Sequence, residues 1–204
     1  PATPPAVFTQ KQAFDAAAAR ALAWAAQLAY ETADEAKFSP ILSRWNWKLE
    51  ATIAADFNSV LPISTTSGFV ARTDDATVIA FTGTEPENLL QWVRNLTIGA
   101  DEGVHEGFES GVEAVWAEQL RPHIAAAASL YFAGHSLGGM EAQNLVQDSV
   151  FRASWNPIGV VTYGSPVTSF NQAGVRYQRF SALNDPVANL GSLTSANYSF
   201  WRTA

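Results

Sequence analysis

The chain has 204 residues, of which 48% are hydrophobic and 12% aromatic, so it is long enough for one domain with a sizeable core and too apolar for a disordered protein. Its net charge of −7 argues against a nucleic-acid partner and against electrostatic docking to anionic membranes, but not against a neutral lipid or ester substrate. It contains no cysteine, which excludes disulfides, a thiolate nucleophile and zinc-thiolate sites.

Two further features concern the kind of protein. No apolar stretch reaches the length of a transmembrane helix. The first residue is Pro1 rather than Met, which indicates a processed or trimmed product, and a removed export signal would agree with a secreted or extracytoplasmic location. The whole chain, 1–204, is interpreted as a single domain.

An alanine-rich helix is predicted over Phe14–Tyr30, because its apolar residues recur at helical spacing and form one buried face. The charged segment Glu31–Lys37 is expected to end this helix. The next segment, Ile41–Phe57, mixes tryptophans with polar residues, and its pattern predicts no single element.

Two strands are predicted over Gly68–Thr73 and Thr77–Thr82, joined as a hairpin by Asp74 and Asp75. The second strand is an apolar run suited to the centre of a sheet. Two helices follow: a short one over Pro86–Leu96 with an apolar stripe, and one that opens near Val104 and ends at Pro122.

Strands and helices then alternate. Strands are predicted over Leu130–Ala133, Ile158–Tyr163 and Val175–Ser181, with a helix over Met140–Val150. This alternation, from residue 77 onward, predicts an α/β fold with a mostly parallel central sheet and helices on both faces.

A glycine-rich turn lies between one of these strands and the helix that begins just after it. Gly134, Ser136 and Gly138 form the pattern G-x-S-x-G, typical of the nucleophile elbow of α/β-hydrolases. Glycines let the neighbouring backbone pass close to the serine, and the helix amides point at the place where an oxyanion develops. The alternative is a glycine-rich strand–helix turn with an inert serine.

Other polar residues also follow predicted strands, and ligands bind at the carboxyl ends of such strands. Asp185 is a candidate to orient the base that activates Ser136, with an Asx-turn before Pro186 as the alternative. Oxyanion donors are expected from Thr84, through its amide and hydroxyl, and from the amide of Leu137. An ordinary turn residue is the alternative for Thr84.

Six ordered blocks carry a resemblance: VIAFTGT, QWVRNL, VHEGF, YFAGHSLGGM, VVTYGSPV and RFSALNDPVANL. In this order they resemble the class 3, fungal-lipase-like family of α/β-hydrolases over most of residues 14–190. The resemblance implies an α/β-hydrolase fold with Ser136 as nucleophile, Asp185 as the triad acid, and Thr84 and Leu137 as oxyanion donors. No metal or organic cofactor is implied.

The resemblance also implies that Pro86–Leu96 is a lid. Its apolar face would hide the site in water and open against lipid, with an ordinary helix packed on the core as the alternative. The residues expected on this face are Leu89, Leu90, Trp92 and Val93.

The triad histidine is not located in this sequence. The three histidines, His105, His123 and His135, all precede Asp185, whereas the family's base follows the aspartate. His135 is expected to point into the sheet, His105 to be structural and His123 to be exposed. Three explanations stay open: a chain truncated at its C-terminus, a lipase-like domain without the full triad, or recruitment of one of these histidines.

The sequence therefore predicts a serine carboxylester hydrolase that acts on acylglycerols or related lipid esters through an acyl-enzyme, at a lipid–water interface. The alternative is a catalytically impaired lipase-like domain that binds a lipid or protein partner.

Overall fold

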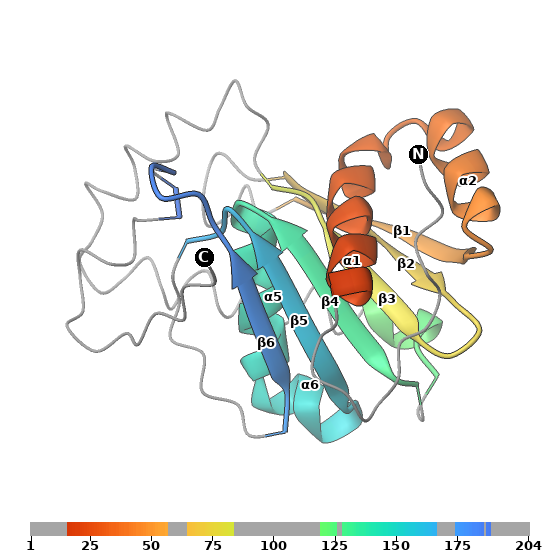
Figure 1. Cartoon of the computed structure of the whole chain (residues 1–204). Helices are drawn as coiled ribbons and strands as arrows, with labels where there is room; N and C mark the ends of the chain where they lie inside the picture. Colours follow the sequence, from red (N-terminus) through yellow and green to blue (C-terminus); the bar gives the residue numbers. More distant parts are fainter. Residues whose placement is uncertain are drawn as a thin grey trace.

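A six-stranded sheet forms the centre of the part of the chain that the structure describes, and its strands lie side by side in chain order (Figure 1). The structure is a computed structural model that describes residues 16–56, 65–83, 119–125, 128–166, 174–185 and 187–188. The strands are β1 (Lys48–Asp56), β2 (Thr65–Arg72), β3 (Thr77–Phe81), β4 (Leu130–His135), β5 (Pro157–Tyr163) and β6 (Arg176–Phe180).

The sheet has an antiparallel half and a parallel half. β1, β2 and β3 form an antiparallel meander, and β3, β4, β5 and β6 run parallel to one another. Phe81 is in register with Gly134, and His135 with Tyr163, so β3, β4 and β5 end at the same edge. The predicted hairpin and the mostly parallel sheet are confirmed, and the residues that follow these strands meet at one edge.

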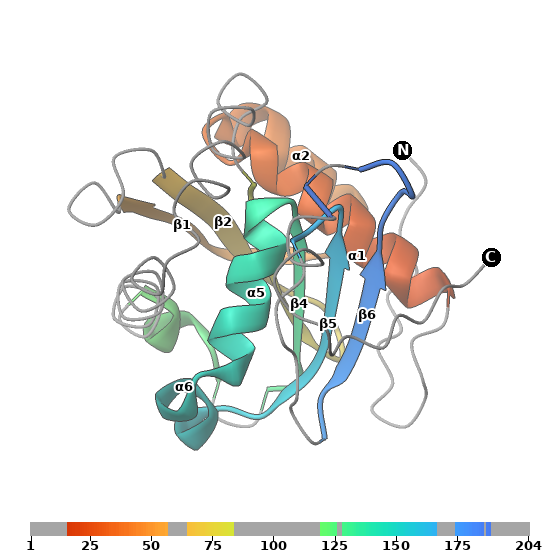
Figure 2. The ribbon, with the colours of Figure 1, turned by 90° about the vertical axis from the view of Figure 1, so that its left-hand side faces the viewer.

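Helix α1 (Ala16–Leu28) covers one face of the sheet and continues into the 3₁₀ helix η1 (Ala29–Glu31) (Figures 1 and 2). Its buried side is mostly alanine, which lets the helix axis approach the strands closely. The hydroxyl of Tyr163 on β5 donates a hydrogen bond to the carbonyl of Ala19 and ties the helix to the sheet. The helix predicted over Phe14–Tyr30 is confirmed from Ala16 onward.

The opposite face of the sheet is covered by α5 (Leu137–Gln147), which is followed by α6 (Ser149–Ser154) (Figure 2). Phe132 on β4 stacks with Phe81 and contacts Phe151 of α6 edge-on, so aromatic packing anchors this layer. Each face of the sheet therefore has its own hydrophobic core. The helix predicted over Met140–Val150 is shifted, because it begins directly after Ser136 and ends at Gln147.

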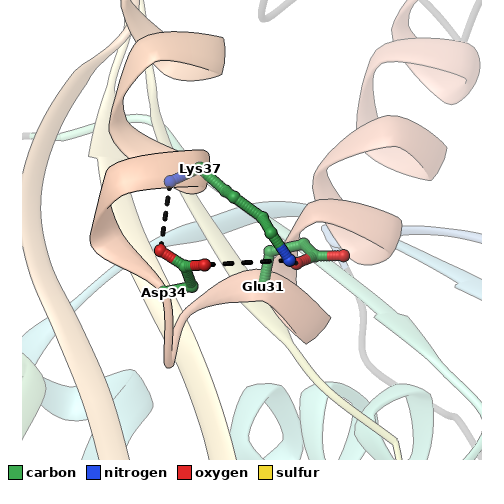
Figure 3. Close-up of polar contacts among 3 residues, drawn as sticks. All are labelled: Glu31, Asp34 and Lys37. Atoms are coloured by element: carbon green, nitrogen blue, oxygen red, sulfur yellow. Dashed lines mark hydrogen bonds and ion pairs between the residues drawn. The ribbon is translucent and has the colours of Figure 1, made fainter.

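Helix α2 (Glu35–Arg44) and strand β1 were not predicted. The charged segment that was expected only to end the first helix contains the start of α2. Asp34 is the N-cap of α2, and its carboxylate accepts a hydrogen bond from the amide of Lys37 at 3.3 Å. The ammonium of Lys37 also lies 3.4 Å from Glu31 and 3.7 Å from Asp34 (Figure 3). The charged segment between η1 and α2 thus supplies the N-cap of α2 and the ion pairs of Lys37 beside it.

The element predicted before Pro122 is described only at its end. Residues 119–120 are helical, and the 3₁₀ helix η2 (Arg121–His123) follows them. Within the described residues, no helix has both the length and the apolar character that a membrane span requires.

Candidate active site

Ser136 occupies a strained turn between β4 and α5. Its backbone has φ of 54° and ψ of −126°, and among the described non-glycine residues only Asn46 also has positive φ. Such a conformation is unfavourable for a residue with a side chain and persists only where the surroundings enforce it. Here the amide of Ser136 donates to the carbonyl of Tyr163 at 2.9 Å, and its carbonyl accepts from Gly139 at 3.1 Å. The structure therefore has a sharp bend at the predicted position.

The glycines of this turn leave no room for a side chain. A Cβ atom on Gly134 would lie 2.2 Å from the carbonyl oxygen of Gly138, and one on Gly138 would lie 2.4 Å from that of Thr82. α5 consequently starts against the ends of β3 and β4. The close backbone approach that was predicted from the G-x-S-x-G pattern is what the geometry requires.

The end of β3 packs directly against the serine. A Cβ on Gly83 would lie 2.8 Å from Cβ of Ser136 and 2.6 Å from the carbonyl oxygen of His135. Thr84, the expected oxyanion donor, is the next residue in the sequence and lies outside the described residues. The lid residues Leu89, Leu90, Trp92 and Val93 also lie outside them.

The hydroxyl of Ser136 is buried and has no hydrogen-bond partner among the described residues. Leu137, the second expected oxyanion donor, is the first residue of α5. The first amides of a helix have no intrahelical acceptor, and the helix dipole favours negative charge near them. A hydroxyl without a partner therefore lies next to a helix N-terminus that can stabilise an anion.

Asp185 lies near the same edge of the sheet. One carboxylate oxygen, Oδ1, accepts hydrogen bonds from the amides of Val187 at 2.9 Å and Ala188 at 3.2 Å. The other, Oδ2, lies 2.9 Å from the position that a Cβ on Gly164 would take. Gly164 directly follows Tyr163, the residue bonded to the Ser136 amide. The Asx-type turn that was the alternative interpretation of Asp185 is thus present, and its hydrogen bonds are accepted by Oδ1.

Arg179 on β6 holds the turn that follows Asp185. Its guanidinium donates to the carbonyl of Ser165 at 2.9 and 3.3 Å and also to the carbonyl of Ala188. Ala188 in turn donates its amide to Asp185. The side chain therefore connects the end of β5 to the aspartate turn.

His135 does not point into the sheet as expected. Its side chain is exposed, and Nδ1 is hydrogen-bonded to the Tyr30 hydroxyl at 2.8 Å. Nε2 lies 3.4 Å from the Cβ position of Gly164, beside Oδ2 of Asp185. Desolvation lowers the pKa of His135, and the negative charge of Asp185 partly opposes this shift. The sheet cores end before this last residue of β4, which explains its exposure.

The other histidines give no base for Ser136. His123 is exposed in η2, as expected, and His105 lies outside the described residues. Since the Ser136 hydroxyl is hydrogen-bonded to no described residue, neither His123 nor His135 is its hydrogen-bond partner in this structure. Among the described residues, no group of three histidine, aspartate or glutamate side chains is placed to hold a metal ion.

Ser165 follows β5 and belongs to a buried hydrogen-bonded cluster that supports the fold. It is fully buried, its hydroxyl accepts from Gln143 at 3.1 Å, and the amide of Gln143 also donates to Gly139 at 2.9 Å. The Tyr177 hydroxyl donates to the Gln143 carbonyl oxygen at 2.9 Å, and burial raises the pKa of Tyr177. These hydrogen bonds connect the first turns of α5 to Ser165 and to Tyr177 on β6.

Sequence reasoning missed two residues of this edge, Tyr30 and Arg179. Tyr30 lies 105 positions from His135 in the sequence, and no local pattern relates the two. β6 is half-buried along its whole length, so its sequence has no alternation that would single out Arg179.

Comparisons with known proteins agree with this arrangement. The family model described as Lipase (class 3) matches residues 78–193, which is more than half of the chain. No curated protein sequence gives a match.

Two solved structures are similar to this chain in fold. The nonglycosylated LIP2 lipase of Yarrowia lipolytica is 17% identical with a TM-score of 0.51, and the match covers 73% of this chain and 58% of that one. M37 lipase is 14% identical with a TM-score of 0.54, and the match covers 79% of this chain and 66% of that one. The chain thus spans about three-fifths of the LIP2 chain. These likenesses identify an α/β-hydrolase fold.

Proposed function

Because the chain belongs to the class 3 lipase family, we propose that it is a serine carboxylester hydrolase that cleaves acylglycerols or related lipid esters. The observation that carries the proposal is the strained turn at Ser136, whose buried hydroxyl has no partner among the described residues and lies beside the N-terminus of α5. Strain of this kind is characteristic of residues held for function.

In the proposed reaction, Oγ of Ser136 attacks the ester carbonyl carbon while a histidine takes its proton. The carbonyl oxygen becomes an oxyanion, which the amide of Leu137 and the amide and hydroxyl of Thr84 stabilise. Each such donor is typically worth about 3 kcal/mol of the barrier. The alcohol leaves with the proton from the histidine, and water then releases the acid from the acyl-enzyme.

Asp185 is proposed to orient that histidine and stabilise its cation. The two amide hydrogen bonds to Oδ1 fix the carboxylate, and Oδ2 lies close to Gly164. The histidine itself is not assigned, since neither His123 nor His135 is hydrogen-bonded to the Ser136 hydroxyl.

The test compares the natural full-length protein with its Ser136→Ala variant on p-nitrophenyl esters of several chain lengths. We expect the variant to lose at least about 10³-fold in kcat, as removal of a triad nucleophile does. Ser43→Ala is the matched control, because Ser43 is an exposed serine on α2 whose hydroxyl donates to the carbonyl of Ser39, and its loss should leave the rate unchanged. Equal rates for Ser136→Ala and the unmodified protein would refute the proposal.

A fluorophosphonate probe separates the two candidate functions. A working triad labels Ser136 within minutes, whereas an impaired, lipid-binding domain labels slowly or not at all. Slow labelling together with saturable binding of an acylglycerol analogue would favour the binding function.

Interfacial activation by a lid over residues 86–96 is part of the proposal, supported by the apolar stripe of that segment. The rate with tributyrin should rise sharply once the substrate exceeds its solubility and forms droplets. A hyperbolic dependence through that concentration would argue against a lid.

A further inference from the structure

Tyr30 connects two sides of the candidate site with one hydroxyl group. It lies in η1, directly after the helix that covers one face of the sheet, and reaches the ends of two strands. Its hydroxyl accepts a hydrogen bond from the amide of Gly83 at 3.0 Å and contacts Nδ1 of His135 at 2.8 Å. These residues flank the two groups whose relative position matters most, since Gly83 precedes Thr84 and His135 precedes Ser136.

The chemistry of the groups sets the direction of the first hydrogen bond and limits that of the second. The amide of Gly83 can only donate, so it occupies a lone pair of the Tyr30 oxygen. Nδ1 of His135 meets either the hydroxyl proton or another lone pair of Tyr30, and the negative charge of Asp185 near Nε2 favours the first arrangement, in which Nδ1 is the acceptor. A neutral imidazole that accepts at Nδ1 carries its proton on Nε2, the nitrogen that lies beside Gly164 with Oδ2 of Asp185.

The backbone at Gly83 has no room for a side chain or for displacement toward its neighbours. A Cβ on Gly83 would lie 2.5 Å from the Tyr30 hydroxyl oxygen and 2.8 Å from Cβ of Ser136. The peptide of Gly83 is therefore confined between the tyrosine and the serine. A small shift of this peptide would change its approach to the turn that carries Ser136.

We propose that Tyr30 is a positioning residue, which holds the peptide of Gly83 after β3 at a fixed distance from the His135–Ser136 turn and selects the His135 tautomer protonated on Nε2. The proposal rests on the proposed ester hydrolysis at Ser136. Tyr30 does not touch the reacting atoms in this account. It acts through the backbone that carries the expected oxyanion donor.

The test replaces the hydroxyl alone, by Tyr30→Phe in the natural full-length protein. The oxyanion forms only in the transition state, so we expect kcat on p-nitrophenyl butyrate to fall about 10- to 100-fold, with KM changed less than about twofold. The control is Tyr131→Phe, which removes another tyrosine hydroxyl, one at the start of β4 that accepts a hydrogen bond from Arg176 at 3.3 Å. Its kcat should stay within about twofold of the unmodified protein.

A second measurement does not depend on activity. The ¹⁵N chemical shifts of the His135 ring should report Nε2–H in the unmodified protein and in Tyr131→Phe, and a mixture of tautomers in Tyr30→Phe. A merely structural tyrosine would not change this ratio. The thermal midpoint of each variant identifies any general loss of folding.

Failures of the two proposals give different patterns. If Ser136→Ala abolishes the activity but Tyr30→Phe retains full kcat, the positioning role is wrong and the ester hydrolysis stands. An Nδ1–H tautomer in the unmodified protein also overturns the positioning role, and so does an equal fall of kcat in Tyr131→Phe. If Ser136→Ala has no effect, the hydrolase itself is refuted.

Discussion

At the scale of single residues, the candidate site depends on positions where a side chain is excluded. Gly138 is the strongest case, because a Cβ there would lie 2.4 Å from the carbonyl oxygen of Thr82 and 2.6 Å from that of Phe81. Both obstacles are backbone atoms of the sheet, which cannot move aside as the end of a flexible side chain can. The elbow is consequently enforced by packing from β3 as well as by the chain itself.

Gly138→Ala should therefore destabilise the protein by more than about 3 kcal/mol, because β3 and α5 must separate. Urea unfolding measures the change. Gly174→Ala is the control: Gly174 has φ of 85° with no atom within 4 Å of its Cβ position, so the substitution meets backbone strain without a collision. It should cost about 1 kcal/mol. Equal losses for the two variants would show that steric exclusion at Gly138 is not the cause.

His135 provides a residue-scale prediction of pH dependence. Its pKa is lowered in the folded protein, so between this value and the ordinary value of about 6.5 the unfolded chain binds more protons. The stability contributed by neutral His135 is fully present above about pH 6.5 and is lost progressively as the pH falls from that value to the lowered pKa of the folded protein.

The thermal midpoint of the unmodified protein should consequently fall more steeply from pH 7.5 to pH 5.5 than that of His135→Gln. His105 and His123 are common to both proteins, so the difference between the two slopes isolates His135. Parallel slopes would contradict the lowered pKa.

At the scale of elements, the start of α2 shows how a short charged segment can define two helices. The Asp34 carboxylate satisfies the amide of Lys37, whereas the ion pairs of Lys37 involve side chains that are largely exposed, 67% for Lys37 itself (Figure 3). An N-cap is generally worth more than an exposed ion pair. The cap should therefore contribute more to α2 than the charges around it.

Asp34→Ala should lower the free energy of unfolding by about 1 kcal/mol, and Lys37→Gln by less than about 0.5 kcal/mol. Chemical denaturation in low salt and in 0.5 M NaCl distinguishes the two effects, because salt screens the ion pairs and leaves the cap. A larger loss in Lys37→Gln than in Asp34→Ala would reverse this ranking.

The element scale also shows what the sequence could predict. β3, β4 and β5 are apolar runs buried on both sides, so their composition alone indicates central strands. α2 and β1 were missed because Pro40 lies inside the helix, and because β1 is an edge strand whose residues alternate less regularly. Long-range pairs such as Tyr30 with His135 leave no trace in local patterns.

At the scale of the whole molecule, the sheet separates two hydrophobic cores that share its central strands. Leu22 of α1 is fully buried in one core, and Leu145 of α5 is buried in the other. Because β3, β4 and β5 contribute side chains to both, we expect loss of either core to unfold the same cooperative unit.

Leu22→Ala and Leu145→Ala should each cost about 2–5 kcal/mol, and the double variant should cost their sum within about 0.5 kcal/mol, since the sheet lies between the two sites. Urea denaturation followed by fluorescence and by circular dichroism measures this. Coincident transitions are expected, and two separate transitions would show that the cores unfold independently.

The strand order has a consequence for biosynthesis. Because each strand of the described sheet pairs with the one before it, no strand has to insert between two that are already joined. A nascent chain can thus extend the sheet at one open edge as it leaves the ribosome. The meander can assemble first, and the turn at Ser136 acquires its strained shape only after β4 joins β3 and β5 supplies the Tyr163 carbonyl. The turn that carries the candidate nucleophile is therefore one of the last parts of this sheet to form.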